Sequence, residues 1–408
     1  MGISIGLVGL GQFGTAFADL FRSHPAVDRV ALCDREPERM KAIAARRGWD
    51  KKFHPRDTYD TLDELLRTDV DAVVIITQPW LHAPQCVQAM EAGKHVYSAV
   101  PIMCVPDGDE ILDWCGRIIE TSRRTGQLYM LGETTYYHPE TMFCRRKAAE
   151  DAFGHFVYAE GEYFHDVDAG CNLRDVYRHR TASASGREWL DVKKRYQAAN
   201  IKSGPMHYPT HSTSGPVSVM QAHAAKVTAY GYANRVDDPF FDDYAYSNEV
   251  ALFKMTNGAT VRICEFRELA GPPHAGETFR IIGTRGMFAE GRWKENFRTD
   301  SSPARPLEIT SPTEQEMRDA LPAEVALAFK QIDTPDATDH SDFTHLGHGG
   351  SHPYLVHEFV DAVAALRQPV INPWVAARYM VMGVMAHKSA LRDGETLDVP
   401  DFGDPPGP

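Results

Sequence analysis

The sequence has no apolar run long enough to span a lipid bilayer, and none of its 7 cysteines forms a Cys-x-x-Cys pair. Positive charge is also scarce, because 43 Lys and Arg residues stand against 56 Asp and Glu residues, for a formal net charge of −13. These absences argue against a membrane segment, a disulfide framework and a nucleic acid partner, which needs a basic surface. The sequence therefore predicts a small-molecule partner.

The length of 408 residues exceeds that of one ordinary core and favours two domains. A hydrophobic content of 43% and a charged content of 24% are typical of a globular protein. The first strand-like run begins at Ile3 and leaves no room for a signal peptide ahead of it. We therefore expect a cytoplasmic protein.

Residues 3–8 form an apolar, strand-like run that enters a glycine turn and then a helix. In a G-x-G-x-x-G motif the first glycine (Gly9) permits the tight turn, and the third (Gly14) lets the helix pack on the strand. The middle glycine lets the backbone approach a pyrophosphate, which binds the free N–H groups of the helix start. The turn residues that we expect at a dinucleotide cofactor are Gly9, Gly11, Gln12, Phe13 and Gly14.

The second predicted strand, residues 29–34, ends in Asp34, which lies 34 − 14 = 20 residues after Gly14. A carboxylate at this spacing binds the ribose 2′-hydroxyl and repels a 2′-phosphate, so it favours NAD over NADP. Arg35 is also expected at the cofactor, and it is the feature that argues for NADP over NAD.

Strands and helices continue to alternate up to residue 133, which predicts a doubly wound parallel sheet and an NAD-binding Rossmann domain over residues 1–133. The further strands are expected at 70–76, 95–98 and 128–131, and the helices at 36–47, 82–92 and 107–125. Ligands bind at the carboxyl ends of such strands. The candidates after the strand at 70–76 are Thr77, Gln78, Pro79 and His82.

After a helix at 139–150 the strand signals come in adjacent pairs, and Asn257-Gly258 is a strong hairpin signal. The strands are expected at 156–164, 226–232, 249–255, 259–267, 279–282 and 287–288. The pairing predicts an α+β substrate-binding domain over 134–408 with an open, largely antiparallel sheet. Residues 300–348 are interpreted as loop with one helix over 314–330, before helices that begin at Ser351, as N-cap, and at 374.

Together these features resemble the glucose–fructose oxidoreductase, inositol dehydrogenase and MocA family (Gfo/Idh/MocA) over nearly the whole chain. In that family a Glu-Lys-Pro tripeptide carries a lysine that touches the nicotinamide ribose and the substrate hydroxyl. The matching residues here are Ala99-Val100-Pro101, so Val100 occupies the lysine position at the cofactor. The resemblance implies that another side chain must handle the proton.

A second set of motifs is similar to the NAD-dependent glycosidases of the α-N-acetylgalactosaminidase type. The matching residues are Glu133, Tyr163-Phe164-His165-Asp166, Tyr208-Pro209-Thr210-His211, Gly347-His348-Gly349-Gly350 and Pro400-Asp401-Phe402. The sequence departs from that branch at Ser212-Thr213-Ser214, where the branch has Gly-Leu-Gly, and at Ser351-His352-Pro353. We expect these departures to line the sugar pocket, so the identity of the sugar is not carried over.

Oxidation of a hydroxyl needs a base within hydrogen-bond reach. His211 is the first candidate because an imidazole titrates near neutrality, and Tyr208 shares the proton if its neighbours lower its pKa. His165, with Tyr163 in the same motif, is the second candidate, and Glu133 is expected to contact the cofactor or sugar or to orient a histidine. For His345, His348 and His357 a structural role is the simpler interpretation.

His207 and His211 would share one face of a helix and suggest a metal site. Pro209 between them disfavours a helix because it removes a donor and clashes with the preceding turn. No metal is expected.

The sequence thus predicts an NAD-dependent oxidoreductase that acts on a hydroxyl of a sugar or glycoside. One alternative is a glycosidase that works by transient oxidation, elimination, water addition and reduction. Another is a non-catalytic NAD-binding sensor, although a sensor has no evident need for two Tyr/His pairs. The resemblance also implies a homo-oligomer that forms through the open sheet.

Overall fold

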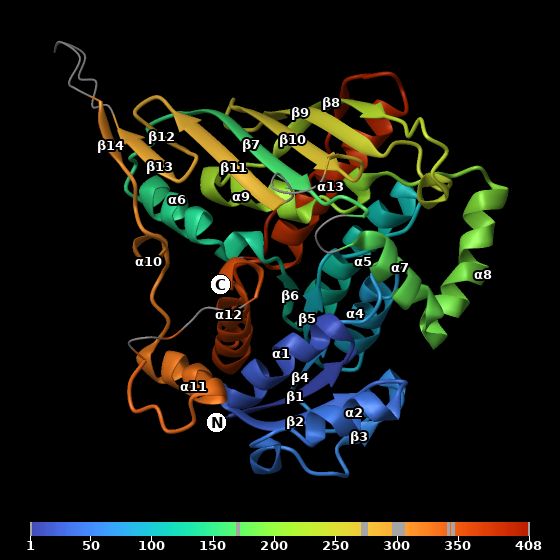
Figure 1. Cartoon of the computed structure of the whole chain (residues 1–408), viewed down its shortest axis with the longest axis vertical. Coiled ribbons are helices and arrows are strands. Elements are labelled where there is room, and N and C mark those ends of the chain that lie inside the picture. Colours follow the sequence, from blue (N-terminus) through green and yellow to red (C-terminus); the bar gives the residue numbers. More distant parts are fainter. Residues whose placement is uncertain are drawn as a thin grey trace.

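The computed structural model describes residues 2–168, 172–270, 276–295, 307–340, 343 and 347–406. Two sheets lie at opposite ends of the molecule, and helices fill the space between them (Figure 1). The prediction for His345 falls outside the described residues. No helix within the described ranges is both long and apolar enough to cross a bilayer.

The N-terminal sheet is parallel, with strand order β3-β2-β1-β4-β5-β6, which confirms the predicted Rossmann fold. Its strands are β1 (Ile3–Val8), β2 (Val27–Cys33), β3 (Thr58–Tyr59), β4 (Ala72–Ile75), β5 (His95–Ala99) and β6 (Tyr129–Gly132). Its helices are α1 (Gln12–Ser23), α2 (Pro37–Ala44), α3 (Leu62–Leu66), α4 (His82–Glu91) and α5 (Gly108–Thr125). Sequence reasoning missed the edge strand β3, whose two residues are too few to show a period.

The second sheet has the order β14-β13-β12-β11-β7-β10-β9-β8-β15 and is antiparallel except between β7 and β10. Its strands are β7 (Phe156–Phe164), β8 (Ala224–Tyr232), β9 (Asn248–Met255), β10 (Thr260–Phe266), β11 (Gly276–Gly283), β12 (Gly286–Ala289), β13 (Arg292–Glu295), β14 (Glu308–Thr310) and β15 (Leu397–Asp398). The largely antiparallel prediction is confirmed.

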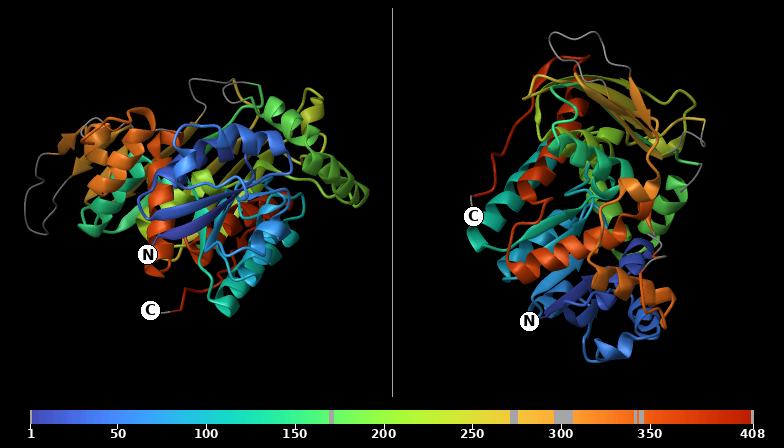
Figure 2. Two further views of the ribbon diagram at one scale, coloured as in Figure 1. Left: turned by 90° about the horizontal axis from the view of Figure 1, so that it is seen from below. Right: turned by 90° about the vertical axis from the view of Figure 1, so that its left-hand side faces the viewer.

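Helices cover the face of this sheet that is turned toward the nucleotide-binding domain, as two views agree (Figure 1 and Figure 2). The helices of this half are α6 (Pro139–Ala149), α7 (Leu173–Ala182), α8 (Ala184–Ala198), α9 (Thr210–Met220), α10 (Glu314–Met317), α11 (Ala323–Asp333), α12 (His352–Ala365) and α13 (Pro373–Ala390). The opposite face carries exposed apolar side chains, among them Tyr230 and Leu252.

The C-terminal helices tie the two halves together. Phe359 of α12 packs on Phe21 and Tyr97 of the Rossmann domain, with ring centroids 6.3 Å and 5.6 Å away. Helix α13 contacts both α5 and β8. The proposed domain boundary at residues 133 and 134 follows β6 directly, and the last helices pack across it.

Two local predictions were wrong. The single helix expected over 314–330 is two helices, α10 and α11, because Pro322 cannot continue a helix and instead precedes a new one. The stretch expected to be loop also contains β14, while residues 300–306 of it lie outside the described ranges. Ser351 does precede α12, but its hydroxyl donates to the His348 carbonyl at 2.9 Å instead of capping the helix.

Candidate active site

The glycine turn has the geometry that a dinucleotide requires. Gly9 has φ +87°, and a Cβ on Gly14 would lie 2.0 Å from the Gly9 carbonyl oxygen, so neither position tolerates a side chain. A Cβ on Gly11 would meet nothing within 4 Å. The start of α1 therefore opens onto free space, where its N–H groups fit a pyrophosphate.

Asp34 lies beside this turn at the carboxyl end of β2. Its side chain is buried and accepts hydrogen bonds from the backbone N–H of Leu10 at 2.7 Å and of Glu36 at 2.8 Å. The carboxylate is thus fixed where a ribose hydroxyl is expected. Arg35 points elsewhere, because its guanidinium pairs with both carboxylate oxygens of Glu188 on α8, each at 2.9 Å.

The turn after β4 holds Thr77, Gln78 and Pro79, and His82 begins the helix that follows it. Its Nδ1 lies 2.8 Å from the Pro101 carbonyl and its Nε2 lies 3.4 Å from that of Thr77, while burial lowers its pKa to about 4. His82 therefore contacts the turns after β4 and β5, and its role at the cofactor stays a prediction. Gln78 and Pro79 lie in this turn, and their carbonyls accept backbone hydrogen bonds.

Gln12 is exposed at the first turn of α1, whereas the Phe13 ring packs edge-on against His348, with centroids 5.2 Å apart. The turn after β5 presents the backbone of Val100, whose carbonyl accepts the Tyr208 hydroxyl at 3.2 Å. This contact joins the lysine-less turn to the second domain.

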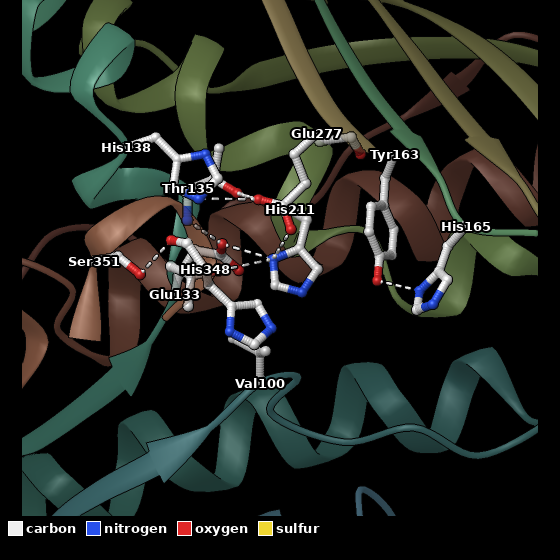
Figure 3. Close-up of polar contacts among 12 residues, drawn as sticks. Val100, Glu133, Thr135, His138, Tyr163, His165, His211, Glu277, His348 and Ser351 are labelled. Carbon is white, nitrogen blue, oxygen red and sulfur yellow. Dashed lines mark hydrogen bonds and ion pairs between the residues drawn. The ribbon is translucent and has the colours of Figure 1, made fainter. Parts of the chain in front are cut away.

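His211 stands in the first turn of α9, between two carboxylates. Its Nδ1 lies 2.9 Å from Oε1 of Glu133 at the end of β6 and 3.8 Å from Oε1 of Glu277 on β11. Figure 3 shows this group with Val100 below it and the Tyr163–His165 pair to one side. Since Nδ1 is held by Glu133, Nε2 is the nitrogen left for a substrate hydroxyl.

The electrostatics of this pair correct the sequence-based expectation for His211. Burial lowers the pKa of His211, but Glu133 and Glu277 outweigh it and raise the pKa to about 9. Burial raises the pKa of Glu133, yet the His211 charge and the hydrogen bonds hold it below its ordinary value. The resting pair at neutral pH is an imidazolium and a carboxylate, so His211 does not titrate near neutrality.

Tyr208 is not acidified. Burial raises its pKa above the ordinary value despite the positive charge of Arg180, because the ring is enclosed. The condition on which Tyr208 would share the proton is therefore not met. The Tyr208 ring lies 5.6 Å from that of His211, so the tyrosine remains a neutral neighbour of the pair.

The Tyr163–His165 pair offers a hydrogen-bond donor at Nε2 of His165. The Tyr163 hydroxyl lies 2.5 Å from Nδ1 of His165, and burial raises the tyrosine pKa well above its ordinary value. Burial, together with the charges of Arg267 and His211, lowers the pKa of His165 to about 3. The neutral imidazole accepts at Nδ1 and carries its hydrogen on Nε2, which is buried without a partner among the described residues.

A row of side chains across four strands was missed by sequence reasoning. The register places Glu249 beside Glu265, Glu265 beside Tyr163, and Tyr163 beside Glu277. Each carboxylate has a basic partner: His387 lies 2.7 Å from Glu249, Arg267 lies 2.8 Å from Glu265, and His138 lies 3.3 Å from Glu277. No motif marks these residues, and only strand register brings them together.

The Ser-Thr-Ser departure does not line a pocket. Ser212 is buried and donates to Glu265, and the Thr213 hydroxyl lies 3.0 Å and 3.2 Å from two backbone carbonyls. Ser214 is fully buried. This stretch packs under the sheet, so the expectation that it contacts the sugar is wrong.

His207 and His211 do not share a face. His207 ends a 3₁₀ turn, Pro205–His207, and its Nδ1 lies 3.1 Å from the Val105 carbonyl. Helix α9 begins only at Thr210, after Pro209. His348, which sequence reasoning left as structural, instead lies beside Glu133 and His211 (Figure 3).

Comparison with protein families agrees with this geometry. The model of the Gfo/Idh/MocA oxidoreductase family, NAD-binding Rossmann fold, matches residues 3–132. Residues 3–132 are therefore similar to the NAD-binding domain of that family. The match ends at β6, one residue before Glu133.

The chain is also similar to curated glycosidases. It is 28% identical over 223 residues to a glycosyl hydrolase family 109 protein of a Shewanella species, covering 53% of this chain and 43% of the relative. It is 27% identical over 221 residues to an α-N-acetylgalactosaminidase of Shewanella oneidensis, with the same coverage. These two alignments span less than half of the relatives. A family 109 protein of Stenotrophomonas maltophilia is 23% identical over 430 residues, covering 98% of this chain and 89% of the relative.

Solved structures share the fold of both halves. A levoglucosan dehydrogenase in complex with NADH and levoglucosan has a TM-score of 0.71 at 17% identity, covering 98% of this chain and 100% of that one. A scyllo-inositol dehydrogenase from Lactobacillus casei, with NAD(H) and scyllo-inositol bound, has a TM-score of 0.64 at 16% identity, covering 98% and 99%. The arrangement of the parallel sheet and the second sheet is therefore a fold that this chain shares with these structures.

Proposed function

We propose that this protein is an NAD-dependent oxidoreductase that oxidises a hydroxyl of a sugar or glycoside. The buried His211–Glu133 pair carries the proposal, because it supplies a proton acceptor beside the turn where the family lysine is missing. The fit of the glycine turn to a dinucleotide and the sugar-directed names of the relatives support it.

NAD, when bound, accepts a hydride from the carbon that bears the hydroxyl. The hydroxyl proton passes to Nε2 of His211, and a carbonyl is left on the sugar, so the charges balance. Glu133 holds Nδ1–H and stabilises the imidazolium that results. Because the pKa of His211 is about 9, oxidation is favoured in alkaline solution and the reverse reduction near neutrality.

The His165 Nε2–H and the buried site around it suit a substrate with several oxygens. One hydroxyl is oxidised at His211, while a second oxygen accepts the hydrogen bond from His165 and orients the ring. The Tyr163 ring lies between the two histidines in Figure 3, with its centroid 4.8 Å from that of His211 and 5.3 Å from that of His165.

We propose NAD over NADP because Asp34 is fixed at the ribose position and Arg35 is engaged by Glu188. A cytoplasmic location and self-association through the open sheet stay predictions.

A second candidate function is a glycosidase that uses the redox step transiently. The second Tyr/His pair and the family 109 relatives favour it. Oxidation to the ketone acidifies the neighbouring C–H, a base removes that proton, and the aglycone leaves with the bonding electrons. Water then adds, and the hydride returns to the ketone, so no NADH accumulates.

One experiment distinguishes these functions. The protein is incubated with NAD and a panel of free sugars and nitrophenyl glycosides, and NADH absorbance and nitrophenol release are followed together. Accumulation of NADH supports the oxidoreductase, and nitrophenol release without NADH supports the glycosidase. Tight NAD binding with neither signal would contradict both and leave the sensor.

A further inference from the structure

Helix α8 belongs to the second domain and contacts two turns of the nucleotide-binding domain. At one end of this contact, Glu188 pairs with Arg35 in the turn after β2. The next residue, Trp189, stacks on Trp80 in the turn after β4, with centroids 4.8 Å apart and planes 12° apart.

These two turns flank the place where the adenosine half of a dinucleotide binds. Strands β2 and β4 lie on either side of β1 in the sheet, so their carboxyl ends border the glycine turn. In doubly wound folds the dinucleotide lies across these ends, with the ribose of its adenosine at the acidic residue after β2. A helix that bridges the two turns therefore crosses the adenosine end of the site.

We propose that α8 is a clamp that retains the cofactor, closed by the Trp80–Trp189 stack and the Arg35–Glu188 pair. The inference rests on the proposed binding of NAD. It adds Glu188 and Trp189 to the residues that act on the cofactor, and it assigns them to the rate of cofactor release.

The attachment of this segment is suited to opening. Helix α7 buries no residue, and α8 buries only Gly186, Trp189 and Tyr196. Beyond the clamp contacts, α8 is held near its C-terminal end, where Tyr196 and Arg195 contact Glu110 of α5 and Lys193 pairs with Asp243. An element with so few buried contacts opens at a lower free energy than the core does.

The two clamp contacts differ in strength. Trp189 is 7% exposed, so its indole stack contributes as a buried aromatic pair. The Arg35 and Glu188 side chains are 53% and 63% exposed, and an ion pair at such exposure contributes little. Loss of the stack should therefore speed cofactor release more than loss of the charge.

A retained cofactor has a consequence for the reaction. A dehydrogenase must release NADH after each turnover, whereas a redox-neutral glycosidase regenerates NAD in place. A clamp that slows release is suited to the second cycle, so the release rate also bears on the choice between the two proposed functions.

The test is the rate at which NADH leaves the loaded protein when excess NAD is added, followed by NADH fluorescence in a stopped-flow instrument. We expect Trp189→Ala to increase this rate about five- to tenfold and Glu188→Gln to increase it by about threefold or less. Leu190→Ala is the matched control, because this neighbour is 41% exposed and takes no part in either contact. Wild-type release rates in both clamp variants, with unchanged thermal unfolding, would overturn the clamp.

Hydrogen exchange of the unmodified protein is a second readout that needs no variant. The clamp predicts slower amide exchange in α8 when NADH is bound, and unchanged exchange there would contradict it. A wild-type protein that fails to bind NADH would contradict the proposed NAD binding itself. Binding without an effect on α8 would contradict the clamp alone.

Discussion

The two sheets build their ligand-facing edges by opposite means. In the parallel sheet the edge is made of backbone: a glycine turn, a helix start and apolar strands such as β4, whose residues are all buried. In the second sheet it is made of side chains, with Glu249, Glu265, Tyr163 and Glu277 in one register row on the face that α9 and α13 cover.

The two edges differ in the free energy that burying their polar groups requires and in the chemistry that they support. A backbone cradle is already hydrogen-bonded and suits an anion that is bound but not transformed. Buried carboxylates are costly unless paired, and each of the three has a basic partner within 3.3 Å. The raised pKa of His211 depends on both edges, because Glu133 at the end of β6 and Glu277 in the register row both raise it.

The largest effect should come from the side-chain edge. We expect His211→Ala to lower turnover by about a hundredfold or more, the contribution of a positioned base, while leaving the affinity for NAD unchanged. Steady-state kinetics and calorimetric titration measure the two quantities. His155→Ala, at an exposed histidine, is the control. Full turnover in His211→Ala would contradict the assignment of His211 as the base and would mean that another group accepts the proton.

The backbone edge is tested by Gly11→Ala. Gly11 has φ −69° and an added Cβ meets nothing, so thermal stability should not change. The Cβ would instead project toward the pyrophosphate and weaken NAD binding by about tenfold or more through lost hydrogen bonds to the anion. Gly14→Ala, whose Cβ meets the Gly9 carbonyl, should lower the unfolding temperature as well. Unaltered NAD affinity in Gly11→Ala would contradict the cradle.

A smaller effect is expected from Ser212→Ala, which tests whether this contact with the register row serves stability or substrate binding. Ser212→Ala removes a buried donor to Glu265, whose pKa burial raises to about 7. The free energy of unfolding should fall by about 1–3 kcal/mol, while KM for the sugar stays the same because Ser212 does not reach it. Denaturant unfolding and kinetics check the two. A changed KM with unchanged stability would show that Ser212 does contact the sugar.

The smallest effect is expected at the turn that lacks the lysine. Val100→Lys should not raise dehydrogenase activity, because proton handling has moved to His211 and the Val100 side chain is buried in the core. Initial rates of NADH formation suffice to measure this. A large gain would show that the usual family mechanism is merely impaired in this chain.

The first domain could be predicted closely because its signals are local. Gly9, Gly14 and the strand-end Asp34 each act through their own backbone or neighbours, and the structure places them as expected. The contacts of His82 were not predictable from local signals, since only the fold reveals that its two nitrogens face carbonyls of separate turns.

The second domain was predictable in its strands but not in its register row. Motif matches located His211, Glu133, Tyr163 and His165, and the structure brings these four together. Glu277 and Glu265 became visible only through strand pairing, which links residues more than 100 positions apart. The raised pKa of His211 depends on such distant carboxylates, and for that reason the sequence suggested titration near neutrality.

The pH dependence of kcat/KM for hydroxyl oxidation tests the central claim most directly, because it reports the pKa of the base in the free enzyme. A base must be unprotonated to accept the proton, so with a His211 pKa of about 9 the rate should rise as pH increases toward that value. Glu133→Gln removes the nearest negative charge and should move this rise to lower pH. A profile without such a rise, or one that Glu133→Gln leaves in place, would contradict the His211–Glu133 pair as the proton acceptor.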